Sequence, residues 1–199
     1  MTKQNRQYRN FSVGNFKAVK DEPYTVRGYF TTFNDPYDLY EDFDGPVREV
    51  MLPEALNGAD MSDVIFQFNH DGMVMARQRN GSLEVGTDEH GGWCKASLGG
   101  CQQGRDLYEA ITNELVDQMS FGFTYADGGV RWDEATRTLV VSGISKVFDV
   151  SAVSVPANPG TEIHARGYLD GVIEESRQQE MVRRADRDRR MRIAMSLKL

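Results

Sequence analysis

The segment Gln118-Met119-Ser120-Phe121-Gly122-Phe123 sets a small hydroxyl residue in a run of alternating large apolar groups. The alternation predicts an extended strand with Met119, Phe121 and Phe123 on one face and Ser120 and Gly122 on the other. Because Gly122 has no side chain, a substrate backbone could pass close beside the Ser120 hydroxyl. Ser120 is therefore a candidate nucleophile.

Strand-like runs rich in β-branched and aromatic residues lie on both sides of this segment. Pro36 and Pro53 follow two of them and end them. Two short runs joined by a Gly-rich turn predict a hairpin. The predicted strands cover residues 24–33, 47–52, 63–70, 82–86, 92–98, 119–125 and 138–155.

Two segments have helical character. Residues 106–117 carry Asp106 as a candidate N-cap and Leu107, Ile111 and Leu115 at four-residue intervals, which predicts an amphipathic helix. Residues 168–195 are rich in Glu, Arg and Gln with a thin apolar stripe and predict a solvated or partner-seeking helix. The expected fold class is mainly β with α, mostly antiparallel, with an internal helix and a helical C-terminal tail.

The composition is that of one globular domain. The chain has 199 residues, of which 40% are apolar. It has no long apolar run and no signal-type N-terminus, so we expect a cytoplasmic protein that does not enter a membrane. The expected organisation is a β domain over residues 1–165 and a charged helical tail over residues 166–199.

The net charge of −7 is unevenly distributed along the chain. Residues 1–165 carry fourteen Lys/Arg against twenty-four Asp/Glu, and residues 166–199 carry nine against six. Because an acidic surface repels phosphates, we expect no direct nucleic-acid binding by the main domain. The tail is the one segment expected to make a basic contact.

A serine nucleophile needs a base and a group that orients the base. The candidate bases are His70, His90 and His164. His70 ends a predicted strand, just before the expected turn at Asp71-Gly72. Asp149 lies in another predicted strand, on the face that alternation shares with Val147. A buried carboxylate is costly without a partner, so we expect Asp149 to be paired, with an imidazole or with a cation such as Lys146.

A zinc site is the alternative chemistry. His70, His90, Cys94 and Cys101 are suitable ligand types, but the two cysteines lack the short spacing of a zinc knuckle. Cys94 and Cys101 are more simply interpreted as reduced thiols. The sequence therefore predicts neither a metal nor an organic cofactor.

Four motifs occur in an order that resembles the HK97-type phage prohead protease family, over roughly residues 24–163. They are Gly28-Tyr29-Phe30, Phe68-Asn69-His70-Asp71, Met119-Ser120-Phe121-Gly122-Phe123, and Phe148-Asp149-Val150-Ser151-Ala152-Val153 followed by Val155-Pro156-Ala157-Asn158-Pro159.

The resemblance implies a serine endopeptidase related in fold to herpesvirus maturation proteases, hence a mostly antiparallel β-barrel. It implies Ser120 as nucleophile and His70 as general base. For the third residue it implies Asp149, with His164 as the alternative. This chain departs from the family's more usual glutamate by having the shorter aspartate at position 149.

The resemblance also implies partners and a location. Such enzymes cleave the major capsid protein or scaffold segments, and usually themselves, inside the procapsid assembling in the host cytoplasm. A homo-oligomer is possible on this interpretation. The alternative is a non-catalytic assembly or scaffold protein that binds capsid subunits through residues 168–195.

Overall fold

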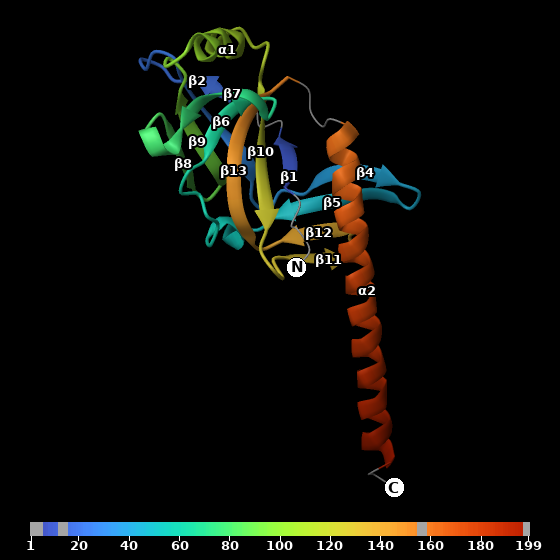
Figure 1. The fold of residues 1–199 in the computed structure, drawn as a ribbon. Helices are drawn as coiled ribbons and strands as arrows, with labels where there is room; N and C mark the ends of the chain where they lie inside the picture. The colour runs from blue at the N-terminus through green and yellow to red at the C-terminus, as the bar shows by residue number, and fades with distance from the viewer. Residues whose placement is uncertain (1–5, 12–15, 155–158, 197–199) are drawn as a thin grey trace.

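The computed structural model describes residues 6–11, 16–154 and 159–196, and within these ranges leaves out the side chains of residues 10–11, 159–170, 176, 180, 192 and 194–196. The described strands form three sheets (Figure 1). The first has the order β1 (Gln7–Phe11), β10 (Gln118–Tyr125), β13 (Ile144–Val153), β6 (Ile65–Phe68), β7 (Asp71–Arg77). The second has the order β11 (Val130–Asp133), β12 (Thr138–Val141), β5 (Gly45–Met51), β4 (Tyr37–Asp42). The third has the order β2 (Lys17–Ala18), β3 (Thr25–Thr32), β9 (Gly91–Ser97), β8 (Leu83–Thr87).

The expected mainly β fold with mostly antiparallel pairing is confirmed. Among the described strands, β12 with β5 and β13 with β6 pair in parallel, and an isolated parallel bridge joins Asp60 to Lys146. The expected barrel is not found, because β1 and β7 end the first sheet and pair with no further described strand. β11 and β4 likewise end the second sheet, and β2 and β8 end the third. Among the described strands, the three sheets are therefore open and pack around a common core.

The core is built on the apolar face of β10, as its alternation predicts. Phe121 and Phe123 are fully buried, with ring centroids 4.5 Å apart, and Phe30 of β3 packs 5.3 Å from Phe121. Ser120 and Thr124 on the other face are also buried. β10 is therefore covered on both sides, and its polar face lies under other parts of the protein.

The internal helix begins earlier than predicted. Helix α1 spans Gln102–Thr112, and the Cys101 side chain caps it by accepting a hydrogen bond from the Gly104 N–H. Asp106 is inside the helix rather than at its N-cap. Because Gly104 has no side chain, the first helical turn can pack against the Leu98 carbonyl group, which shifts the start of the helix. Leu115, expected on the apolar stripe, lies beyond the helix end and is exposed.

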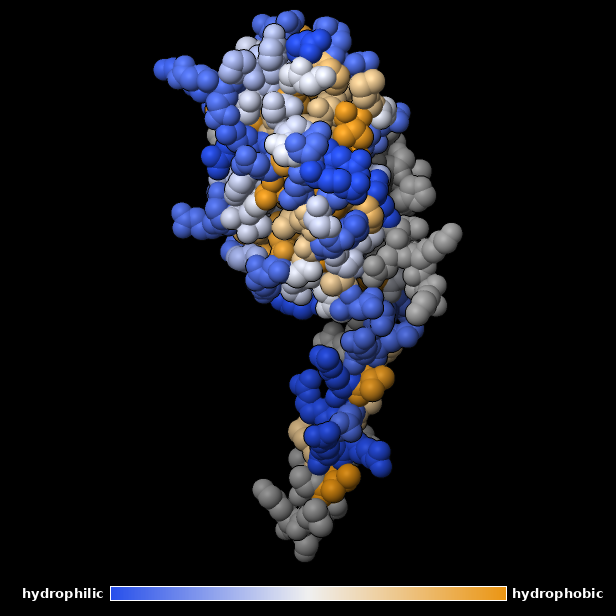
Figure 2. Space-filling model, turned by 60° about the vertical axis from the view of Figure 1, so that its left-hand side comes forward, coloured by the Kyte–Doolittle hydropathy of each residue, from blue (hydrophilic) through white to orange (hydrophobic). Residues whose placement is uncertain are grey.

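The C-terminal helix α2 spans Pro159–Ser196 and continues across the expected boundary between residues 165 and 166. Its first half packs on the body through Val172 and Ile173 and through an ion pair between Arg177 and Glu134. The second half projects away from the sheets (Figure 1). Figure 2 shows isolated hydrophobic side chains among hydrophilic ones on this projecting part.

Among the described helices, none combines the length and the apolar character that a membrane span requires. Two 3-10 helices, Pro53–Leu56 and Gln78–Asn80, complete the described elements.

Candidate active site

Three strands of the first sheet align their residues in rows beneath the candidate site. β10 lies between β1 and β13, and Tyr8, Gly122 and Asp149 are directly opposite one another across the three strands. Two rows along, Ser120 lies opposite Ser151. Residues opposite one another in a ladder project to the same face, so Ser120 and Asp149 share one face of the sheet.

A bulge in β13 places Asp149 on that face. The register shifts between Gly122 and Phe123, so that Phe123 is opposite Val147 and Phe148 is the extra residue. Strict alternation predicted that Val147 and Asp149 would share a face. The bulge instead leaves Val147 on the aromatic face with Phe123 and puts Asp149 on the face of Ser120, because one extra residue reverses the alternation.

His70 lies in the tight turn between β6 and β7. Asn69 and His70 have φ values of 53° and 58°, and Phe68 pairs with Asp71 across the turn. A two-residue hairpin loop with both residues at positive φ has the twist that joins neighbouring strands. The turn was expected at Asp71-Gly72, but these residues begin β7. Asn69 fixes the turn, since its Oδ1 accepts a hydrogen bond from the Ser154 N–H at the end of β13.

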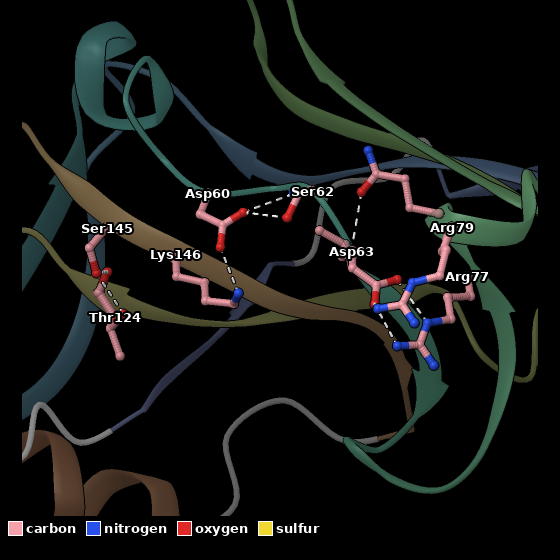
Figure 3. Close-up of polar contacts among 10 residues, drawn as sticks. Asp60, Ser62, Asp63, Arg77, Arg79, Thr124, Ser145 and Lys146 are labelled. Atoms are coloured by element: carbon pink, nitrogen blue, oxygen red, sulfur yellow. Dashed lines mark hydrogen bonds and ion pairs between the residues drawn. The ribbon is translucent and has the colours of Figure 1, made fainter.

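Ion pairs hold the other end of the β6–β7 hairpin (Figure 3). Asp60 lies 2.6 Å from Lys146 of β13, and the hydrogen bond from Lys146 lowers the pKa of Asp60. Asp63 accepts a hydrogen bond of 2.8 Å from Arg77 Nε, and this bond lowers the pKa of Asp63 to about 2. Arg79 also contacts Asp63. These ion pairs hold the open end of the hairpin together and tie the segment before β6 to β13, the strand that carries Asp149.

The structure brings His70, Ser120 and Asp149 together. His70 Nε2 lies 2.5 Å from Ser120 Oγ, and His70 Nδ1 contacts Asp149 Oδ1. Ser120 and Asp149 are fully buried, and the His70 side chain is 16% exposed. With the proton on Nδ1, the imidazole donates to Asp149 and its free Nε2 accepts from the Ser120 hydroxyl. This arrangement can activate an alcohol as a nucleophile.

Asp149 has two different oxygen environments. Oδ1 accepts hydrogen bonds from His70 and, at 3.1 Å, from the Ser151 hydroxyl. Oδ2 is buried without a hydrogen bond, and its nearest described cation is Arg6, whose Nη1 is 3.6 Å away. Gly122 makes room for the carboxylate, because a Cβ there would overlap Asp149 Oδ2. From the sequence, Gly122 was expected to let a substrate backbone pass close to Ser120. In the structure, it makes room for the Asp149 carboxylate.

The remaining candidate residues lie elsewhere. His90 is exposed in the turn between β8 and β9, with its ring 4.7 Å from that of Tyr29. Cys94 is buried in β9, and burial raises the pKa of its thiol to about 12. In the described part of the chain, no three His, Cys, Asp or Glu residues lie close enough together to hold a metal ion. The His164 side chain lies outside the described residues.

Arg6, Tyr8 and Ser151 surround the three residues and were not singled out from the sequence. Ser151 had a detectable signal, because strand alternation places position i+2 on the same face as Asp149. Arg6 and Tyr8 had none, since their segment was not predicted to be a strand. Only the pairing of β1 with β10 brings them to the site.

Comparison with known proteins gives one informative result. The family model of the caudovirus prohead serine protease matches residues 14–174. No curated protein and no solved structure gives a significant match.

Proposed function

Because the chain belongs to the caudovirus prohead serine protease family, we propose that it is a serine endopeptidase in which Ser120 is the nucleophile, His70 the general base and Asp149 the orienting acid. The observation that carries the proposal is the continuous contact from Ser120 Oγ through the His70 ring to Asp149 Oδ1. A buried serine in contact with an imidazole that is itself held by a carboxylate matches the roles needed for acyl transfer.

The reaction follows from these contacts. His70 Nε2 takes the Ser120 proton as Oγ attacks the scissile carbonyl carbon, which forms a tetrahedral intermediate. The C–N bond then breaks, and His70 returns the proton to the leaving amine. Water, activated by the same imidazole, hydrolyses the acyl-enzyme. Asp149 holds the Nδ1–H tautomer and stabilises the imidazolium.

The short aspartate at position 149 is compatible with this role. The parallel pairing of β13 with β6 places the His70 turn beside β13, and Gly122 leaves space for the carboxylate. A longer side chain is therefore not needed to reach Nδ1. These features support Asp149 as the third residue.

A prohead protease acts on capsid proteins within the procapsid. For this chain we propose cleavage of the major capsid protein or of scaffold segments, together with self-cleavage, in the host cytoplasm. The division into a protease domain over residues 1–165 and a tail over 166–199 is part of this proposal. The projecting half of α2 would then direct the enzyme to its assembly partners.

The test is coexpression of the protein with the capsid and scaffold proteins of the same phage. Intact-mass spectrometry of the wild type should show cleavage at defined bonds, and Ser120→Ala should abolish it while keeping the melting temperature. Ser97→Ala is the matched control, because Ser97 is an exposed strand serine in another sheet. Cleavage by Ser120→Ala, or none by the wild type, would contradict the proposal and favour a non-catalytic assembly protein.

A further inference from the structure

The N-terminal strand β1 lies at the edge of the first sheet, beside the strand that carries Ser120 (Figure 1). Its side chains alternate between the two faces. Arg9 is opposite Phe121 and lies on the aromatic face, whereas Tyr8 is opposite Gly122 and lies on the face of Ser120. The strand therefore contributes both to the core and to the candidate active site.

Arg9 anchors the strand. It is 4% exposed, and its Nε donates to both carboxylate oxygens of Glu49, at 2.7 and 2.9 Å. The hydroxyl groups of Tyr125 and Tyr37 also donate to this carboxylate. Burial alone would lower the pKa of Arg9, but the opposing charge of Glu49 raises it. Arg9 stays charged, and moving β1 away would leave Glu49 buried without its cation.

Tyr8 forms one wall around the His70 imidazole. The two ring centroids are 4.4 Å apart, at an interplanar angle of 55°. A Cβ on Gly122 would lie 2.9 Å from Tyr8 Cε1, so the close approach of this ring depends on the glycine. The imidazole is thus confined by Tyr8 on one side and by its contacts with Ser120 and Asp149 on others.

Arg6, the residue just before β1, reaches the carboxylate of Asp149. Its guanidinium lies over the Phe148 ring, 3.9 Å from the centroid, and its Nη1 donates to the Tyr8 hydroxyl at 3.4 Å. The same Nη1 lies 3.6 Å from Asp149 Oδ2. The bulge that turns Asp149 toward His70 also supplies Phe148 as a platform for this guanidinium.

We infer that β1 completes the active site, with Arg6 as a positioning residue that acts on Asp149 and Tyr8 as one that confines His70; the inference rests on the proposed function. Oδ2 of Asp149 has no hydrogen bond, and a buried carboxylate oxygen without compensation is costly. The cation of Arg6, 3.6 Å from Oδ2, supplies the compensation. With Oδ2 directed at Arg6, Oδ1 is left to face Nδ1.

The test measures the reactivity of Ser120 without relying on a particular peptide substrate. A tagged fluorophosphonate reacts with an activated serine: the Oγ–P bond forms, the P–F bond breaks, fluoride leaves, and the serine proton passes to His70. We expect Arg6→Gln to label about tenfold more slowly than the wild type. The labelling rate of Arg6→Lys should be within about threefold of the wild-type rate, because lysine restores the positive charge but not the planar stacking on Phe148.

Arg48→Gln is the matched control, because Arg48 is similarly exposed and its ion pair with Asp38 is remote from Ser120. It should label like the wild type. Tyr8→Phe keeps an aromatic ring beside His70 and should retain most of the labelling rate. Tyr8→Ala removes the ring and should lose most of that rate. Melting temperatures of all variants distinguish slower chemistry from unfolding.

The outcomes separate the two proposals. Wild-type rates in both Arg6→Gln and Tyr8→Ala would overturn the inference and leave the protease assignment intact. Equal losses in Arg6→Gln and Arg6→Lys would overturn the positioning role of the charge. Absence of Ser120-dependent labelling in the wild type would count against the proposed function and, with it, the inference.

Discussion

The two ends of this chain carry the same kind of ion pair in opposite surroundings. Near the N-terminus, Arg9 of β1 pairs with Glu49 of β5, and their side chains are 4% and 0% exposed. In the projecting half of α2, Arg190 and Asp186 are 80% and 51% exposed. Water screens the second pair and not the first, so only the first determines where a segment of the chain must lie. The difference shows that β1 is part of the body that carries the candidate active site, whereas the projecting half of α2 is not.

The largest effect is expected at Gly122, on which the contact between β1 and the active site depends. Gly122→Ala would push a methyl group into Asp149 Oδ2 and the Tyr8 ring, so Ser120 labelling should fall by about a hundredfold. Gly171→Ala in α2 is the control, because a Cβ there meets nothing within 4 Å. Equal labelling rates in the two variants would show that the reactivity of Ser120 does not depend on the close packing of Tyr8 and Asp149 against Gly122.

A smaller effect, on the free energy of unfolding, is expected when one partner of each ion pair is removed. Glu49→Ala leaves Arg9 buried and unpaired and should lower the free energy of unfolding by about 3–5 kcal/mol. Asp186→Ala should cause no measurable change, because its pair is exposed. Urea unfolding followed by tryptophan fluorescence measures both. A loss below about 1 kcal/mol in Glu49→Ala would show that Arg9 does not anchor β1.

The smallest effect is expected from removing residues 180–199. This deletion keeps Val172, Ile173 and the Arg177 ion pair, which hold α2 on the body. It removes a segment whose described apolar side chains are exposed, Met181, Val182, Met191 and Ile193. Labelling of Ser120 and the melting temperature should match those of the full chain. A change in either would mean that the outer half of α2 supports the body.

The same deletion tests whether the tail directs the enzyme to its assembly partners. If the projecting segment directs assembly, cleavage of coexpressed capsid protein should fall although Ser120 labelling is retained. Unchanged capsid cleavage would remove the tail from substrate delivery. The division of the chain at residues 165 and 166 stays a prediction until such a variant is measured.

Much of the body could be predicted, because its strands alternate strongly. The predicted strands over residues 24–33, 47–52 and 119–125 correspond to β3, β5 and β10. The predicted run 138–155 proves to be two strands, β12 and β13. β1 and β4 were missed, since their polar and charged residues obscure the apolar period on which the prediction depends.

The residues of the candidate site were proposed from the sequence, but their geometry was not predicted. His70, Ser120 and Asp149 were selected by residue type and resemblance, yet the turn that carries His70 was placed two residues too late. Glu49 carried a signal that was overlooked: a lone carboxylate between Val47 and Met51, on a buried strand face, requires a buried partner.

The sequence by itself determined the apolar face of β10, the small residues opposite it, and the charged character of the C-terminal helix, because these are local patterns of side-chain chemistry. Only the tertiary structure decided that Phe148 is bulged so that Asp149 faces His70. It also decided that β1 brings Arg6 and Tyr8 to the same place. Registers and bulges depend on packing between segments far apart in the chain, and no local pattern contains that information.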